Sequence, residues 1–277
     1  MLPSTFSHIP GIGLKTEQRF WEYGVCHWDD FSPAALPRMP AGKCAAIEKW
    51  IEDSRLRLAD SPSFFTNLLP PARHWRIFPH FRAKTAYLDI ETTGGAYGED
   101  HITAISLFDG NAVTTYVWGD NLEDFIDDIS SFQVLVTFNG KSFDVPMIER
   151  HFRTKLDHAH IDLRHVLASL GFRGGLKSCE KQLDIYRGEM DGVDGWFAVL
   201  LWHEYVNNGN DKALETLLAY NVLDTVNLEV LMVEAYNLFM DKLPFAHHYR
   251  LDYPVRPGNP YRADYATIDM LRRRFSL

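Results

Sequence analysis

Short apolar stretches between residues 84 and 138 predict a group of β-strands. Four runs are rich in β-branched and aromatic residues, as strands are: 84–90, 101–108, 111–119 and 132–138. Asp109-Gly110 is a turn signal that joins the second run to the third. The last run, FQVLVTF, is apolar throughout, which is typical of a buried parallel strand.

Segments before, between and after these strands have apolar residues at helical spacing. Helices are expected at residues 41–59, 121–129, 143–152, 211–239 and 265–275, and a short strand followed by a helix at residues 160–172. Three strands in a meander followed by alternating helices and strands predict an α/β fold, with a mixed sheet and helices on its faces.

Composition divides the chain into three regions. Residues 1–80 are rich in Pro, Trp and Phe and predict a small, mainly helical domain. The strand-bearing domain is expected at residues 84–240, followed by a C-terminal extension at residues 241–277. The extension is either an ordered wrap around the domain or a basic contact surface, and the sequence favours neither.

The formal net charge of −9 is unevenly distributed. Residues 1–82 carry 10 basic and 8 acidic side chains, residues 83–240 carry 11 and 25, and residues 241–277 carry 7 and 4. The central region therefore has a net charge of −14 between mildly basic flanks. Most of its acids are expected to be solubilising surface charges. An acidic domain can still bind a polyanion if divalent cations neutralise its site.

Cysteine usage and hydrophobicity predict a cytoplasmic location. Cys26, Cys44 and Cys179 are odd in number and show no paired spacing, which favours buried thiols in a reducing compartment over disulfides or a zinc site. The amino terminus lacks a secretory signal pattern. No run approaches the 18 or so apolar residues of a membrane-spanning helix, so no membrane contact is expected.

Three polar features carry candidate chemistry. Asp89 and Glu91 are two residues apart on a predicted strand, so both point to one face of the sheet. Asp144 follows the buried strand at residues 132–138, where open α/β sheets present functional loops. Tyr220 and Asp224 are one helical turn apart on one helix face. Each feature alone is more typical of a structural role, but clustered carboxylates also suit hard divalent cations.

The combination and order of these features resemble a known family. Asp-x-Glu on a strand, then Asn-x-x-x-Phe-Asp, then Tyr-x-x-x-Asp on a helix resemble the DEDD 3′→5′ exonucleases of the RNase H-like superfamily, in their tyrosine branch. The stretches WRIFPHFRAKTAYLDIETTG, HIDLRHVLASLGFRGGLKSCEKQL and ALETLLAYNVLDT are similar to YprB-type ribonuclease H-like domains. The resemblance covers about residues 84–240. It implies an RNase H-like mixed five-stranded sheet flanked by helices.

The resemblance also implies roles for five residues. Asp89 would bridge two divalent metal ions, Mg²⁺ or Mn²⁺, with Glu91 and Asp224 on the first ion and Asp144 near the second. Tyr220 would orient the attacking water as a neutral phenol, because its ordinary pKa is near 10. The histidine branch has its base five residues before the last aspartate, where this chain has an alanine.

Several other residues are candidates for nucleic-acid contact. Asn139 matches the family position near the terminal nucleotides, and Gly94 would let the backbone approach the 3′ end. Lys141 is equally well interpreted as a phosphate contact or a solvated loop lysine. Phe143 is expected in the core rather than against a base. His158, His160 and Asp162 look like a metal tract, but a ligand role for them is disfavoured.

The segment at residues 8–25 resembles half of a helix-hairpin-helix. Its Gly11, Gly13 and Lys15 match the turn whose backbone amides bind a nucleic-acid phosphate. Packing of this helix start on the nuclease domain is the favoured alternative.

We therefore expect a metal-dependent 3′→5′ exonuclease that acts on single-stranded nucleic acid with a free 3′ end. DNA is slightly favoured over RNA. One alternative is a nucleic-acid-binding or scaffold protein with a weak or inactive nuclease fold. Another is an endonuclease that cuts RNA–DNA hybrids, although Tyr220 argues against it because those enzymes lack this helical tyrosine.

Overall fold

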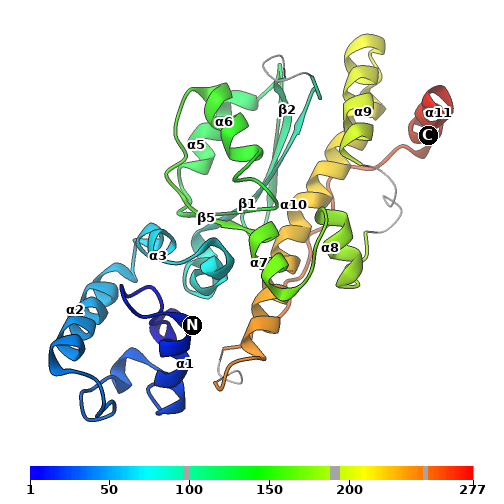
Figure 1. The fold of residues 1–277 in the computed structure, drawn as a ribbon. Helices are drawn as coiled ribbons and strands as arrows, with labels where there is room; N and C mark the ends of the chain where they lie inside the picture. Colours follow the sequence, from blue (N-terminus) through cyan, green and yellow to red (C-terminus); the bar gives the residue numbers. More distant parts are fainter. Residues whose placement is uncertain (96–99, 188–193, 246–248, 277) are drawn as a thin grey trace.

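The computed structural model describes residues 1–95, 100–187, 194–245 and 249–276. A five-stranded sheet forms its centre (Figure 1). The strands are β1 (Thr85–Thr92), β2 (Ile102–Phe108), β3 (Val113–Val117), β4 (Val134–Thr137) and β5 (Ala159–Asp162). The order in the sheet is β3-β2-β1-β4-β5; β2 is antiparallel to both β1 and β3, whereas β4 and β5 run parallel to β1. The predicted mixed sheet is confirmed.

The α-helices before the sheet are α1 (Leu14–Glu22), α2 (Ala41–Arg57), α3 (Pro62–Leu68) and α4 (Phe78–Phe81). Those among and after the strands are α5 (Phe125–Ile129), α6 (Asp144–Phe152), α7 (Leu163–Leu170), α8 (Leu176–Gln182), α9 (Gly195–Asn208), α10 (Asp211–Met240) and α11 (Tyr265–Phe275). Short 3₁₀ turns lie at Leu2–Ser4, Trp28–Asp30, Pro71–Ile77, Arg82–Lys84 and Leu122–Asp124.

Every residue of β2 and β4 is buried, because helices cover both faces of the sheet. Even-numbered residues of β1, such as Leu88, pack with α5 and α6. Tyr87, on the opposite face, belongs to the core that α7 and α10 complete. The period-two pattern of β1 thus directs Asp89 and Glu91 toward α10, on the face of Tyr87.

The 30-residue helix α10 is the central element of the second layer. By length and composition it could cross a membrane, a feature that the count of uninterrupted apolar residues missed. However, 89% of its most apolar window is buried within the protein. Packing against β1, β2 and α9 therefore explains its hydrophobicity.

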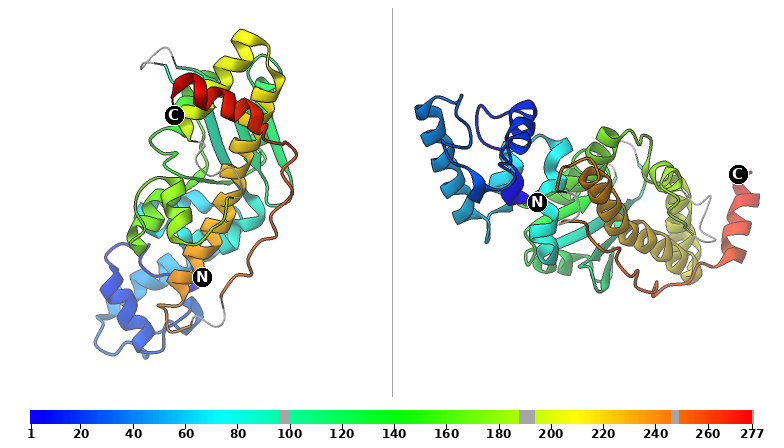
Figure 2. Two further views of the ribbon diagram at one scale, coloured as in Figure 1. Left: turned by 90° about the vertical axis from the view of Figure 1, so that its right-hand side faces the viewer. Right: turned by 90° about the horizontal axis from the view of Figure 1, so that it is seen from below.

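The N-terminal helices lie at one end of the molecule and α11 at the other (Figure 2). Side chains of the first helices share one continuous hydrophobic core with the sheet and α10. The segment before α11 runs back along α10, where Asn237 bonds Leu251 and Asn259 donates to the carbonyl of Ala219. Of the two interpretations of residues 241–277, the ordered wrap describes this path.

Candidate active site

Four acidic side chains that are far apart in the sequence line one pocket of about 420 Å³. Asp89 and Glu91 come from β1, Asp144 is the first residue of α6, and Asp224 comes from α10. Tyr220, one turn before Asp224, lines the same pocket. The structure thus brings together all five residues predicted to be catalytic.

The strand geometry explains why these acids meet. β1 and β4 run parallel, so their carboxyl ends lie at the same edge of the sheet. A register irregularity falls between Glu91 and Thr92, at the end of β1. The chain leaving β4 turns into α6, whose first turn carries Asp144. Because α10 crosses β1, its inward face completes the pocket.

The loop between β4 and α6 is clamped by Asp162, a residue whose role the sequence did not reveal. Its carboxylate accepts hydrogen bonds from the backbone N–H groups of Asn139 (2.8 Å), Lys141 (3.2 Å) and Arg164 (3.0 Å). The turn also needs a glycine at 140, because a Cβ there would lie 2.3 Å from Oγ1 of Thr137. Asp162 is therefore occupied by backbone amides.

The two histidines near Asp162 are also engaged within the fold. His158 Nε2 bonds the carbonyl oxygen of Ile129, and His160 Nε2 bonds Oγ1 of Thr137 at 2.8 Å. Burial and the nearby Lys141 ammonium lower the pKa of His160 to about 3. The Nε2 atoms of both histidines are thus engaged within the fold.

Burial and mutual repulsion dominate the electrostatics of the pocket. Burial, followed by the charges of Asp144, Asp224 and Glu91, raises the pKa of Asp89 well above its ordinary value. The pKa of Glu91 is raised well above its ordinary value mainly by burial and then by Asp224. Burial raises the pKa of Asp144 to about 7. The pocket thus concentrates acidic groups whose charged forms are disfavoured by burial and by one another.

Tyr220 is a neutral phenol in this setting. It is buried, and burial together with the charges of Asp224, Glu91 and Asp89 raises the pKa of its hydroxyl further above the ordinary value near 10. The ammonium of Lys177 lies 4.5 Å from its ring centroid. The raised pKa favours the neutral phenol, which can donate or accept a hydrogen bond.

Polar neighbours already engage two of the four acids. Asn221 donates its side-chain amide to Oδ2 of Asp89 at 2.7 Å, and Arg187 donates to Oδ1 of Asp224. Sequence reasoning missed both partners. The available signal for Asn221 was a polar residue next to Tyr220 inside an otherwise apolar helix. Arg187 carried no such signal, because it lies outside the helices.

The donor set fits a hard divalent cation in chemistry, since carboxylate oxygens are the ligands that Mg²⁺ and Mn²⁺ prefer. Cations would also relieve the repulsion that raises the pKa values of Asp89, Glu91 and Asp144. Across the described residues, however, no group of three or more His, Cys, Asp or Glu side chains is arranged to hold a metal ion. The acids share a pocket without surrounding one point.

Aromatic side chains stand at the rim of the pocket. Phe143 is 42% exposed and Trp196, in the first turn of α9, is 56% exposed. The expectation that Phe143 is a core residue was therefore wrong, because α6 begins at Asp144 and leaves the preceding side chain outside. Gly94 also lines the pocket, and a Cβ on it would lie 2.7 Å from Val199 of α9.

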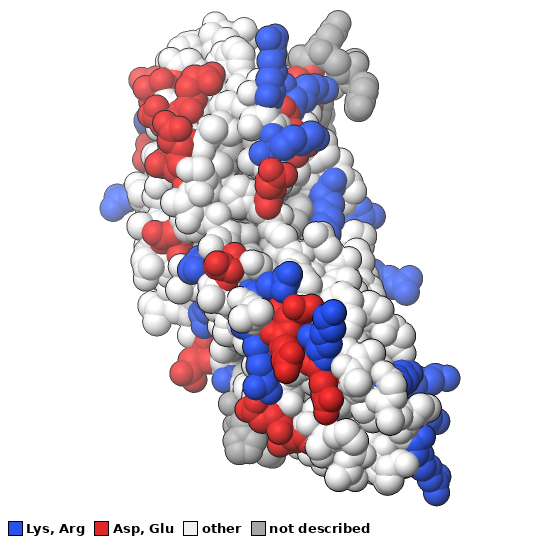
Figure 3. All heavy atoms as spheres, turned by 90° about the vertical axis from the view of Figure 1, so that its left-hand side faces the viewer, with Lys and Arg blue, Asp and Glu red and all other residues white. Residues whose placement is uncertain are grey.

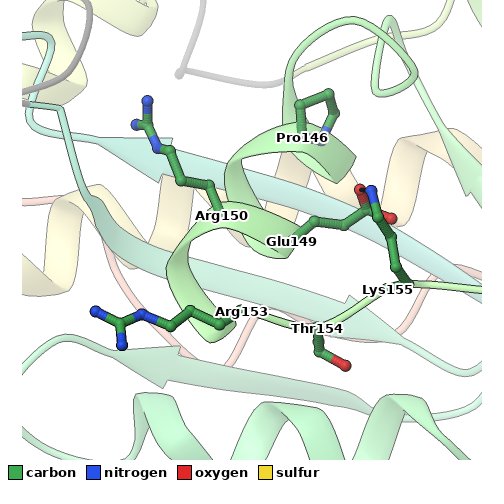
Figure 4. A pocket seen from close by; sticks show the side chains of 6 residues that line it. All are labelled: Pro146, Glu149, Arg150, Arg153, Thr154 and Lys155. Carbon is green, nitrogen blue, oxygen red and sulfur yellow. Dashed lines mark hydrogen bonds and ion pairs between the residues drawn. The ribbon is translucent and has the colours of Figure 1, made fainter.

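A second hollow lies at the other end of α6, lined by Pro146, Glu149, Arg150, Arg153, Thr154 and Lys155 (Figure 4). In Figure 4, Arg150 and Arg153 extend to one side, away from Glu149 and Lys155. Lys155 pairs with Glu149 at 2.5 Å, so the single acid here is neutralised. This hollow therefore lacks the cluster of acids that distinguishes the first pocket.

The other predicted contact residues lie in two places. Asn139 lines the acid pocket, and its Oδ1 accepts a hydrogen bond from Arg164 at 2.6 Å. The half-buried Lys141 follows in the same loop. Gly11, Gly13 and Lys15 are exposed near the start of α1, and Gly13 is its N-cap residue. They belong to the N-terminal helices and do not line the acid pocket.

Comparison with known proteins identifies the family. The model of the RNase_H superfamily matches residues 86–236, more than half of the chain. This protein therefore belongs to the RNase H superfamily, and it has the fold of a nuclease. The matched segment contains the sheet, all four acids of the pocket and Tyr220.

A search of solved structures found similarity to the family B DNA polymerase from the hyperthermophilic archaeon Pyrobaculum calidifontis. The two chains share 13% sequence identity with a TM-score of 0.38, over 64% of this chain and 31% of the polymerase. This chain thus spans about a third of the polymerase's length. The comparison with curated proteins found no match.

Proposed function

We propose that this protein is a metal-dependent 3′→5′ exonuclease that hydrolyses phosphodiester bonds of single-stranded nucleic acid. One observation carries the proposal: Asp89, Glu91, Asp144 and Asp224 line a single pocket together with Tyr220. These are the residue types, in the order, of the tyrosine-branch DEDD exonucleases that the sequence resembles. Membership of the RNase H superfamily supports the same reaction class.

Asp89, Glu91, Asp144 and Asp224 would hold two divalent cations, Mg²⁺ or Mn²⁺. When bound, such ions activate water and stabilise the attacking and leaving oxygens of a phosphodiester. The chain's own contribution is positional. Tyr220, kept neutral by burial and by the acids around it, would orient the attacking water through its hydroxyl.

The rim of the pocket suits a strand with unpaired bases. Phe143 and Trp196 present exposed aromatic surface beside the acids, and unpaired bases stack on such surfaces whatever their sequence. Asn139 lines the same pocket, where it would meet the terminal nucleotides, and Gly94 offers exposed backbone. These features favour single strands over duplexes, whose bases are already stacked.

The N-terminal helices are proposed to bind a part of the strand that lies outside the active site. Gly11, Gly13 and Lys15 offer exposed backbone and a cation at the start of α1. A groove of about 800 Å³ beside α1 is lined by Thr16, Arg19, Phe20, Tyr23, Leu36, Pro37, Arg38, Met39, Pro40 and Lys43. Its charged side chains are all basic, which suits a phosphate backbone.

One face of the molecule is mixed in charge. On the face drawn in Figure 3, acidic side chains gather at the upper left, and acidic and basic side chains alternate lower down. A polyanion would meet repulsion from such acidic groups. The proposal therefore confines substrate contact to the cation-dependent pocket and the basic groove.

Mutation of one site acid tests the proposal. Purified protein supplied with Mn²⁺ is expected to shorten a 5′-labelled single strand stepwise, and Asp144→Asn is expected to reduce the rate at least about a thousandfold. Asp252→Asn is the matched control, because Asp252 is exposed and lies outside the pocket. Equal activity of the Asp144→Asn variant would overturn the proposed site.

A second candidate function is nucleic-acid binding by a weak or inactive nuclease fold. The observation that favours it is the absence, among the described residues, of a group of donors arranged to hold a metal ion. A stoichiometric gel shift with no hydrolysis product in any divalent metal would support this alternative.

A further inference from the structure

Arg187 lies between two buried carboxylates, one of which belongs to the candidate active site. One terminal nitrogen of its guanidinium donates to Oδ1 of Asp224, and the other donates to Oε2 of Glu180 at 2.6 Å. Arg187 is only 8% exposed, so water screens these contacts weakly. One oxygen of a proposed metal ligand is therefore already bonded to a positive charge of the chain itself.

Glu180 fixes the guanidinium from its other side. Glu180 is fully buried on α8, and its Oε1 accepts a hydrogen bond from Nδ2 of Asn227 at 2.6 Å. Asn227 lies three residues after Asp224 on α10, so both partners of Arg187 are tied to the same helix. Charge-assisted hydrogen bonds to two carboxylates hold the planar guanidinium in a defined orientation.

This arrangement distinguishes Asp224 from the other site acids. Within the described ranges, Arg187 forms an ion pair with Asp224, whereas Asp89, Glu91 and Asp144 form none; the Lys177 charge only opposes the rise in the pKa of Glu91. A divalent cation bound at Asp224 would lie close to the guanidinium, and the two positive charges would repel each other in this buried setting. Glu180 offers Arg187 an alternative partner, so release of Asp224 would not leave a buried charge unpaired.

We propose that Arg187 is a positioning residue that competes with the divalent metal ion for Asp224. In the metal-free protein the guanidinium neutralises Asp224 and keeps its side chain ordered. Metal binding then requires Arg187 to give up Asp224 while keeping Glu180. This inference rests on the proposed function, because it concerns the same carboxylates. It predicts that Arg187 lowers the affinity of the site for the metal ion.

Two substitutions with opposite expected effects test the competition. Arg187→Gln removes the competing charge and is expected to bind Mn²⁺ about tenfold more tightly than the unaltered chain. Glu180→Gln removes the alternative partner, so Arg187 stays with Asp224 and Mn²⁺ binding weakens about tenfold. The measurement is calorimetric titration of MnCl₂ into the chelator-treated full-length chain.

Arg82→Gln is the matched control. Arg82 also pairs with a buried carboxylate of α10, Glu229, at 2.8 Å, but Glu229 does not line the acid pocket. Its Mn²⁺ affinity should stay within about threefold of the unaltered chain. If Arg187→Gln fails to fold, the direction of the change in Mn²⁺ affinity is taken from Glu180→Gln alone. Arg187→Lys keeps the charge, so its Mn²⁺ affinity should also stay within about threefold of the unaltered chain.

The outcomes separate this inference from the proposed function. Equal or weaker Mn²⁺ binding by Arg187→Gln, or a shift of both variants in one direction, overturns the competition alone. Opposite shifts in a chain that hydrolyses no strand support the competition and overturn the exonuclease. An unaltered chain that binds no Mn²⁺ overturns both.

Discussion

Two buried carboxylate sites of this molecule solve the same electrostatic problem in opposite ways. Glu17, 1% exposed on α1, accepts hydrogen bonds from Arg76 (2.7 Å) and from the backbone N–H groups of Phe6 (2.7 Å) and Ser7 (2.9 Å). Burial alone would raise its pKa, but Arg76 and these donors bring it below the ordinary value. The protein thus compensates this charge through Oε1, which accepts all three bonds.

The acid pocket lacks such compensation. Asp89 and Glu91 have pKa values well above the ordinary range because burial and neighbouring acids disfavour their charged forms. Arg187 neutralises one acid of the four. The comparison teaches that the fold can satisfy a buried carboxylate where the role is structural. Where burial and repulsion disfavour the charged forms of three acids, a cation from solution is the natural partner.

Breaking the compensated site should have the largest effect on stability. Arg76→Met leaves Glu17 buried without its ion-pair partner, so the free energy of unfolding should fall by about 3–5 kcal/mol. Denaturant unfolding followed by circular dichroism measures the loss. Arg250→Gln, which removes an exposed pair with Asp241, should cost under about 1 kcal/mol. A loss under 1 kcal/mol for Arg76→Met would contradict the structural role.

The uncompensated site should show itself in the pH dependence of stability. The folded-state pKa of Asp144 is about 7, above the unfolded value near 4. Between these values the folded chain binds more protons, so this carboxyl contributes stability at low pH that is lost as pH rises through 7. Without metal, the unaltered chain should therefore lose about 1–3 kcal/mol relative to Asp144→Asn between pH 4 and 7.

Chemical unfolding of both chains at several pH values, in the presence of a chelator, measures this difference. The comparison with Asp144→Asn cancels the contribution of the buried histidines, which also changes with pH because burial lowers their pKa values. MnCl₂ should reverse the trend, because a bound cation favours the charged carboxyl. A difference that stays constant with pH would contradict the electrostatic account of the pocket.

The smallest expected effect concerns the basic groove of the N-terminal helices. Arg38→Glu combined with Lys43→Glu should weaken binding of a long single strand about three- to tenfold. The slope of binding affinity against salt concentration should fall by the equivalent of about one to two phosphate contacts. Fluorescence anisotropy at several salt concentrations measures both quantities. Lys49→Glu, an exposed change outside the groove, is the control. Equal binding by the double variant would exclude the groove from the strand's path.

Much of the fold was predictable because local patterns specify it. The strand predicted at residues 84–90 is β1 at Thr85–Thr92, and the long helix predicted at 211–239 is α10 at Asp211–Met240. Alternation on the strand and helical spacing also placed Asp89 beside Glu91 and Tyr220 beside Asp224. These features depend on residues a few positions apart, which a sequence displays directly.

The rest depends on contacts between distant residues. Arg187 meets Asp224 across 37 positions, and Asp162 clamps a backbone loop more than 20 positions away. A histidine-rich sequence around Asp162 looked like metal ligands, whereas hydrogen bonds within the fold occupy it. The exposure of Phe143 depended on the residue at which α6 begins, and such boundaries are weakly encoded.

The direction of hydrolysis tests the central claim most directly. Identical single strands labelled at the 5′ or the 3′ end are incubated with the protein and Mn²⁺, beside a circular strand. Our account predicts a descending ladder from the 5′-labelled strand, immediate release of labelled mononucleotide from the 3′-labelled strand, and an intact circle. Cleavage of the circle, or a ladder from the 3′-labelled strand instead, would contradict a 3′→5′ exonuclease at this site.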